Sequence, residues 1–186
     1  MKNSFYISQI LPNFSSINFT RPNVATRDLV QHDAGPTTSH WKMLPTKPVL
    51  VMLEPISEDC EGLTQQRLEL LHKILASMKL NSDQYEISQD WTSTFSLETL
   101  SSSLIATPCR IIFMVGAPVA QHFLGKEIKL SQVQGKLQKY SHNNEDFHFI
   151  PLFHPDFIAI NPTIKKMAWE SMQKLTPDLG KLLNQL

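Results

Sequence analysis

The sequence predicts an α/β protein, a three-layer α/β/α sandwich around a mostly parallel sheet, preceded by an extended N-terminal tail. Short continuous apolar runs, such as 49–53 and 111–115, are typical of strands buried on both faces. These runs alternate with segments in which apolar residues recur every three or four positions, as they do in helices. Strands that alternate with helices favour a parallel sheet covered on both faces. Residues 1–47 lack this alternation and contain several prolines and a polar run.

The domain proper, residues 48–186, is predicted to pass from strand to helix several times. Its strands are short apolar runs, and its helices carry an apolar stripe or open with a capping residue or a proline. The predicted elements are strand 49–53, helix 63–79 (capped by Thr64 and broken by 81–83), strand 85–87, helix 96–103, strand 109–115, helix 118–124, strand 147–153 and helix 162–175. One or two further helical turns are expected after Pro177. A polar loop is predicted from the end of helix 118–124 through Gly135. A turn is predicted from Ser141 to Asp146.

The composition is that of one folded domain with a tail. The chain has 186 residues, 41% of them hydrophobic, and its 17 Lys and Arg balance 17 Asp and Glu. A net charge of zero argues against general nucleic-acid binding, which depends on neutralising phosphates. No run approaches the roughly 20 apolar residues that cross a bilayer, and the N-terminus does not resemble a secretory signal. We expect a cytoplasmic protein that makes no contact with a membrane.

The two cysteines, Cys60 and Cys109, lack the CxxC or Cys/His spacing of metal sites. We therefore expect neither a metal nor another cofactor. Two cysteines without a secretory signal also fit a reducing compartment.

The tail has an unusual cluster of large apolar side chains. Such side chains on a segment that does not fold alone need a partner surface. Two interpretations remain open: the segment packs on its own domain, or about residues 5–28 form a docking peptide for another protein. The cluster comprises Phe5, Tyr6, Ile7, Ile10, Leu11, Phe14, Ile17 and Phe19.

Two strand ends define the edge where a site is expected. The strand 109–115 stops at Gly116, and the strand 147–153 stops at His154-Pro155. Ligands of open α/β sheets bind beyond the carboxyl ends of the strands. Gly116 and His154 should therefore share this edge, with any site between them.

The late motifs resemble those of the uracil-DNA glycosylase superfamily. VGAPVAQHFLG, Gly135-Lys136, IPLFHPDFIAINP and Trp169 follow the order of the branch with the pattern GATAAQALLG…RGK…THPSYLLRNP…W. The resemblance covers about residues 48–176 and implies an α/β/α sandwich with a DNA-facing cleft at the strand ends. His154 matches a functional position of that family, and Glu58 or Asp59 would be the carboxylate that handles the water.

The catalytic pattern departs from this family. The glycines of its first motif fall on Met52 or Leu53 and on Ile56, whose β-branched side chain blocks close backbone approach. The Asn that reads the flipped base falls near Gln89, which is one methylene longer, and the four cluster cysteines are missing. Because a flipped base must be held and read by its edge, we expect a site that no longer works. His154 is then a strand-end histidine hydrogen-bonded to a neighbouring loop.

A narrower resemblance is to the psi-subunit family of bacterial DNA polymerase III, whose fold is similar to that of the glycosylases. The family's tail pattern LLxxxGIxxWxLRRP is similar to residues 10–22, with Ile17 in place of Trp and Thr20 in place of the first Arg. Its strand RLVMV is similar to 49–53, and its ANPTARAALWQQI is similar to 160–172. The Asn-Pro-Thr…Trp match, ending at Trp169, is the most specific piece.

This second resemblance implies a replication subunit without catalysis. Its tail would bind the clamp-loader tau/gamma subunits, and its globular domain would bind the chi subunit and through it, indirectly, single-strand-binding protein. Contact with DNA would be weak or indirect. The residues expected at the clamp loader are Ile10, Leu11, Phe14, Ile17, Phe19, Arg21 and Pro22.

Two other functions stay open. One is a base-excision enzyme that releases uracil or another damaged base from DNA, using the four candidates His154, Glu58, Asp59 and Gln89. The other is a glycosylase-fold DNA-binding module without chemistry, which needs a basic track along the cleft. The candidates for that track are Lys126, Lys129, Lys136 and Lys139.

Overall fold

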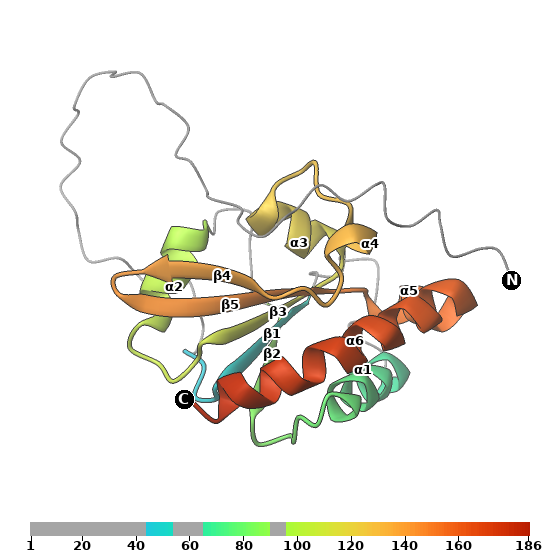
Figure 1. The fold of residues 1–186 in the computed structure, drawn as a ribbon, viewed down its shortest axis with the longest axis horizontal. Coiled ribbons are helices and arrows are strands. Elements are labelled where there is room, and N and C mark those ends of the chain that lie inside the picture. The colour runs from blue at the N-terminus through green and yellow to red at the C-terminus, as the bar shows by residue number, and fades with distance from the viewer. Residues whose placement is uncertain (1–43, 54–64, 90–95) are drawn as a thin grey trace, which may run out of the picture. The chain divides into compact units, whose positions relative to one another are not determined.

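A computed structural model describes residues 44–53, 65–89 and 96–186 of the chain (Figure 1). They form one five-stranded sheet with the strand order β2-β1-β3-β5-β4. Only β4 runs antiparallel to its neighbour, which confirms the predicted α/β class and the mostly parallel sheet. The strands are β1 (Val49–Leu53), β2 (Tyr85–Ser88), β3 (Ile111–Val115), β4 (Gln138–His142) and β5 (Glu145–Leu152).

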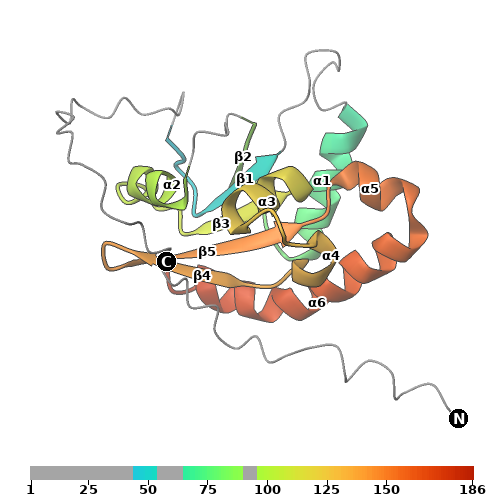
Figure 2. The ribbon, with the colours of Figure 1, turned by 90° about the horizontal axis from the view of Figure 1, so that it is seen from above.

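Helices cover both faces of the sheet, as Figures 1 and 2 show. One face packs against α1, α5 and α6, and the other packs against α2 and α3. The helices of the described residues are α1 (Gln65–Ser77), α2 (Leu97–Leu104), α3 (Ala117–Leu124), α4 (Leu130–Val133), α5 (Pro155–Ile160) and α6 (Pro162–Leu183).

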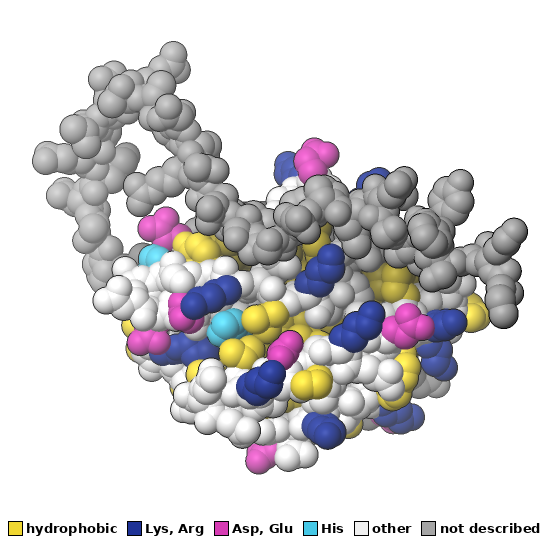
Figure 3. Space-filling view, in the orientation of Figure 1, with side chains coloured by type: hydrophobic (Ala, Val, Ile, Leu, Met, Phe, Trp, Pro, Cys, Tyr) yellow, Lys and Arg dark blue, Asp and Glu magenta, His cyan; other side chains and the backbone are white. Residues whose placement is uncertain are grey.

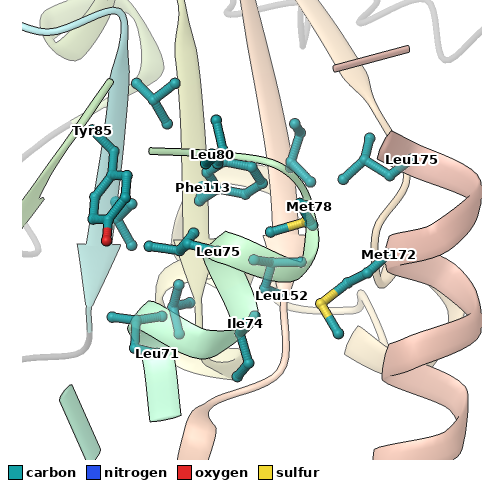
Figure 4. Packing of buried hydrophobic residues seen from close by; sticks show 14 of the residues in the cluster. Leu71, Ile74, Leu75, Met78, Leu80, Tyr85, Phe113, Leu152, Met172 and Leu175 are labelled. Atoms are coloured by element: carbon teal, nitrogen blue, oxygen red, sulfur yellow. The ribbon is translucent and has the colours of Figure 1, made fainter. Parts of the chain in front are cut away.

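Alternation along β1 explains why its sequence is continuously apolar. Val49, Val51 and Leu53 belong to the core under α1 and α6, whereas Leu50 and Met52 belong to the core under α2 and α3. Successive side chains of a strand point to opposite faces, so a strand covered on both faces has no polar position. Figure 4 shows the first of these cores closing around Phe113 of β3.

The helix α1 ends earlier than predicted. Its last residue is Ser77, and Lys79 then takes a left-handed conformation with φ of 62°. The amide of Leu80 donates to the carbonyl of Leu75, which closes the helix end and turns the Leu80 side chain into the core. The chain therefore leaves the helix before the polar residues 81–83. The predicted cap Thr64 and the residues 54–63 lie outside the described residues.

The turn predicted from Ser141 to Asp146 is present but shorter, because only Asn143 and Asn144 form it and the residues on both sides belong to strands. β4 and β5 form a hairpin whose two-residue loop, Asn143-Asn144, has φ values of 51° and 65°. Two positive φ values define the turn that matches the twist of a hairpin, and Asn tolerates them well. β4 escaped prediction because it alternates exposed and half-buried residues without an apolar run. The predicted loop before Gly135 likewise contains one short helix, α4.

The predicted helix 162–175 and the helical turns expected after Pro177 form one continuous helix. α6 runs through Pro177 to Leu183 without a break after Leu175. Proline removes one helical hydrogen bond and crowds the preceding turn. Here Leu175 and Leu179, on either side of it, are both buried, so packing holds the helix together. A short helix that the sequence did not predict, α5, also fills the interval between β5 and α6.

The described domain begins before β1. Pro45 is buried, the amide of Thr46 donates to Glu86 Oε1 at 2.8 Å, and Lys47 Nζ donates to the carbonyl of Ser82 at 2.7 Å. These bonds join the last residues before β1 to β2 and to the turn preceding it. The predicted docking residues from Ile10 to Pro22 lie outside the described residues. Within the described ranges, no helix is both long and apolar enough to cross a membrane.

Candidate functional site

Three neighbouring strands end level at the carboxyl edge of the sheet. Leu53 of β1 pairs with Val115 of β3, which pairs with Leu152 of β5. Gly116 directly follows the end of β3 and His154 lies two residues after the end of β5, so both lie at this edge, as expected from the sequence. Gln89 follows β2, whose Ser88 pairs with Met52. The structure thus gathers three of the predicted positions at one edge, whereas Ile56, Glu58 and Asp59 lie outside the described residues.

Gly116 makes the turn from β3 into α3. Its φ of 103° is one that residues with a side chain rarely adopt. The Gly116 amide donates to the carbonyl of Leu152 at 2.9 Å, and its carbonyl accepts the first helical bond, from Ala120. The glycine is therefore required by the strand-to-helix turn itself.

His154 is the N-cap of α5. Its Nδ1 accepts a hydrogen bond from the amide of Asp156 at 3.3 Å and lies 3.7 Å from the carboxylate Oδ2 of the same residue. With Nδ1 as acceptor, the neutral imidazole carries its proton on Nε2. The ring is 22% exposed, so it lies mostly within the protein.

Asp156 connects this cap to α1. Its Oδ1 lies 2.9 Å from Nε of Arg67, and both side chains are partly exposed. The carboxylate next to His154 is therefore paired with a guanidinium. His154 thus caps the helix that directly follows it, and the Arg67 pair anchors Asp156. The predicted bond was instead to a neighbouring loop.

A second anchor beside His154 has no counterpart in the sequence-based predictions. The buried Gln134 accepts the amide of Phe153 on Oε1 at 2.6 Å and donates from Nε2 to Ser171 Oγ at 3.2 Å. The next amide, of Gly135, donates to the carbonyl of Pro151 at 2.8 Å. These bonds tie the end of α4 to both β5 and α6. No apolar period marks Gln134, so only the position of Gly135 in a matched motif pointed to this region.

Gly135 itself has a packing role. Its φ is 66°, and a Cβ added there would lie 3.0 Å from Cβ of Ser171. A larger residue would be strained in its backbone and would push against α6. The Gly-Lys part of the glycosylase-like pattern is thus used here to bring the chain close to α6.

The candidate basic track is only partly available for an anion. Lys126, Lys129 and Lys136 are exposed. Lys139 lies 2.8 Å from Asp146, and the hydrogen bond from Lys139 lowers the pKa of that carboxyl. One of the four lysines is therefore already paired with a carboxylate.

The described residues contain no cluster of three or more His, Cys, Asp or Glu side chains that could hold a metal ion. Cys109 is a poor nucleophile, because burial raises its pKa to about 12. Next to it, Arg110 donates to the carbonyls of Thr107 and Cys109 and pairs with Glu145 at 3.0 Å. This cluster lies at the opposite end of the sheet and supports the loop that enters β3.

The Asn-Pro-Thr…Trp motif divides into a cap and an exposed ring. Oδ1 of Asn161 accepts the amides of Thr163 and Ile164 at 3.1 and 3.2 Å, and Pro162 begins α6. Trp169, two turns later, remains 48% exposed. It lines a groove of about 440 Å³ to which α1, α5 and α6 all contribute. We call this feature the α1/α6 groove.

Comparison of the chain with models of known protein families gives no match, and neither does comparison with curated protein sequences.

Proposed function

We propose that this protein is a non-catalytic accessory subunit of a bacterial DNA polymerase III holoenzyme, of the psi type, with a glycosylase-related fold. It would join the tau/gamma subunits of the clamp loader to the chi subunit, and through chi to single-strand-binding protein. The observation that carries the proposal is the role of His154. The residue that best matches a functional glycosylase position uses Nδ1 to cap α5.

The surroundings of His154 support the same conclusion. A general acid or base has to reach the reacting atom from a fixed position, and here the ring is held by the helix that it caps. The nearby Asp156 is paired with Arg67. Gly116 and Gly135 both have local structural roles, so the matched glycines do not require a base-binding site.

The Asn-Pro-Thr…Trp segment supports the narrower resemblance. Asn161 and Pro162 specify the start of α6, whereas Trp169 leaves a large aromatic surface in solvent. Trp is one of the residue types that contribute most to protein interfaces. A tail with large apolar residues and a domain with an exposed Trp give the two contact regions that a bridging subunit needs.

The test of the clamp-loader contact is the double variant Phe14→Ala, Phe19→Ala in the full-length chain. Loss of two aromatic side chains proposed as anchors of the interface should cost roughly 2–4 kcal/mol of binding free energy. Binding would be measured by titration calorimetry against the purified clamp loader of the same organism. The double variant Ser15→Ala, Ser16→Ala in the same segment is the matched control and should bind like the wild type. Equal affinity for the aromatic variant and the wild type would refute the anchor assignment, and no wild-type binding would refute the proposed function.

The second candidate is a base-excision glycosylase, favoured by the placement of Gly116, His154 and Gln89 at one edge of the sheet. Its test is release of uracil from single-stranded DNA by the full-length protein. Activity that disappears in His154→Ala, with an unchanged thermal midpoint, would establish this alternative and overturn the non-catalytic proposal. A wild-type protein that releases no base would exclude it.

A further inference from the structure

We infer that the α1/α6 groove is the docking site for an acidic amphipathic helix of a second partner protein. This inference rests on the proposed function, which requires one partner surface on the globular domain in addition to the tail. Its starting point is Trp169, a ring that is exposed on a helix whose inner side chains, Ala168, Met172, Leu175 and Leu179, are buried in the core.

The walls and floor of the groove are apolar. Leu70 and Ile74 of α1 form one side, Trp169 and Met172 of α6 form the other, and Ile158 of α5 closes one part. Ile74 and Met172 are themselves members of the buried core. The ring of Trp169 thus stands beside a hollow whose floor is continuous with the interior, the usual setting of an energetically important interface residue.

The helix α5, which contributes Ile158 to the groove, also carries two exposed apolar side chains. Phe157 is 44% exposed and Ile160 is 78% exposed, and α5 packs against both α1 and α6. Several large exposed apolar side chains on neighbouring elements mark interaction surfaces more often than single ones do.

The charge of the groove determines the chemistry of the partner. Lys73 of α1 and Lys165 and Lys166 of α6 line it, and no carboxylate is among the described residues that do so. On the molecular face that α6 crosses, Figure 3 shows lysine and arginine side chains, and some acidic ones, interspersed with hydrophobic side chains. Opposite charges at the rim of an interface increase the association rate and select the partner. The complement is a segment with apolar residues on one side and Asp or Glu on the others.

The dimensions favour a helix as the bound segment. The groove is lined from Leu70 to Ser77 of α1 and from Pro162 to Met172 of α6, which corresponds to about 10 and 15 Å at 1.5 Å per residue. It can hold the apolar stripe of two to three helical turns, as in other complexes that place a helix in an apolar groove. Nucleic acid is a poorer match, because its phosphates would contact only the lysines and leave the apolar walls exposed.

The N-terminal segment of the same chain is also a poorer match. Within residues 1–43, the basic residues Lys2, Arg21, Arg27 and Lys42 outnumber the acidic residues Asp28 and Asp33. The segment is therefore basic, like the groove. Charge complementarity favours a different chain.

The test uses the full-length protein and the purified chi subunit of the same organism as the probe. Trp169→Ala and the double variant Lys165→Glu, Lys166→Glu change the groove at exposed positions, so both should fold normally. Each should weaken chi binding at least about tenfold in titration calorimetry at low salt. The charge variant should also lose most of the salt dependence of binding. The matched control Lys126→Glu, Lys129→Glu reverses two exposed lysines elsewhere and should bind within about twofold of the wild type.

Measurement of clamp-loader binding separates the two proposals. Groove variants that lose chi but still bind the clamp loader support the inference. If the wild type binds chi and the groove variants bind it equally well, the inference is overturned, whereas the proposed function still holds. A wild-type protein that binds neither chi nor the clamp loader overturns the proposed function, and the inference falls with it.

The same variants would also reveal any other ligand of the α1/α6 groove, and each such result would overturn the inference. A wild-type dimer that Trp169→Ala converts to a monomer would assign the groove to a second copy. Single-stranded DNA binding lost in Lys165→Glu, Lys166→Glu would assign it to nucleic acid. Tighter chi binding by Phe14→Ala, Phe19→Ala would show that the N-terminal segment occupies the groove.

Discussion

The two faces of the sheet are equally buried at the strands but differ at the helices. Phe113 of β3 and Phe149 of β5 have exposures of 0% and 1%, and they belong to opposite cores. α2 and α3 contain none of the exposed large hydrophobic residues of the described chain, whereas α5 and α6 contain Phe157, Ile160 and Trp169. One face is therefore complete by itself. The other is complete at the sheet but leaves apolar surface outside, which suits a protein that binds others.

The largest expected effects test whether both cores support the fold equally. Phe113→Ala and Phe149→Ala each remove a buried ring from one face and should each reduce the free energy of unfolding by about 3–5 kcal/mol. Urea denaturation followed by circular dichroism would measure both. A cost below about 1 kcal/mol for either variant would show that its face is loosely packed.

A smaller effect is expected where α6 meets the chain at Gly135. Gly135→Ala places a Cβ 3.0 Å from Ser171 at a φ of 66°, and should cost about 1–3 kcal/mol through backbone strain and overpacking. The control is Gly180→Ala within α6, where an added Cβ has no neighbour within 4 Å. It should stabilise the protein by about 0.5–1 kcal/mol. Equal thermal midpoints for the two variants would contradict this account.

Loss of the cap of α6 should cost about 1 kcal/mol. Asn161→Ala leaves two first-turn amides without the side-chain oxygen that now accepts them. Asn161→Asp keeps an acceptor and adds a charge that suits a helix N-terminus, so it should remain near the wild-type stability in thermal unfolding. If the Asp variant is as unstable as the Ala variant, the cap is not the reason for Asn at this position.

The smallest expected effect is a pH dependence of protein stability, caused by His148 on the face of the sheet that α1 and α6 cover. Burial lowers the pKa of His148 below its ordinary value, more than the nearby Asp146 raises it. The unfolded chain therefore binds a proton more readily than the folded chain, so stability falls as the pH drops through 6.5, the ordinary value. His148→Gln should reduce the fall in the urea midpoint between about pH 7 and about pH 5. An unchanged fall would exclude His148 as its source.

The sequence was most informative where burial was complete. β1, β3 and β5 are apolar runs covered on both faces, and the points where the runs of β3 and β5 stop were enough to predict that Gly116 and His154 share one edge. β4 could not be predicted, because an edge strand with one solvated face has no apolar run. Pro177 led the prediction to divide α6 into two pieces, whereas the burial of Leu175 and Leu179 on either side of it keeps the helix continuous.

The same limit applies to the candidate site. Sequence spacing identified His154, but its role as a cap depends on the position of the Asp156 amide, which only the folded chain defines. Gln134 has no sequence signal, because its importance comes from two partners, at 153 and 171, that the fold brings to it. Likewise, a Trp at a helical spacing is typical of a core residue, and only the packing of α6 determines that Trp169 is half exposed.

The edges of the sheet have a consequence for the way in which other chains can approach. An exposed row of unpaired main-chain groups invites a strand from another molecule. β2 is only four residues long, and its Glu86 side chain accepts a hydrogen bond from the amide of Thr46, which precedes β1. At the other edge, β4 carries the ion pair of Lys139 with Asp146. Short or charged edge strands oppose the addition of a strand from another chain and the aggregation that results from it. We therefore expect partners to bind this domain through its side chains.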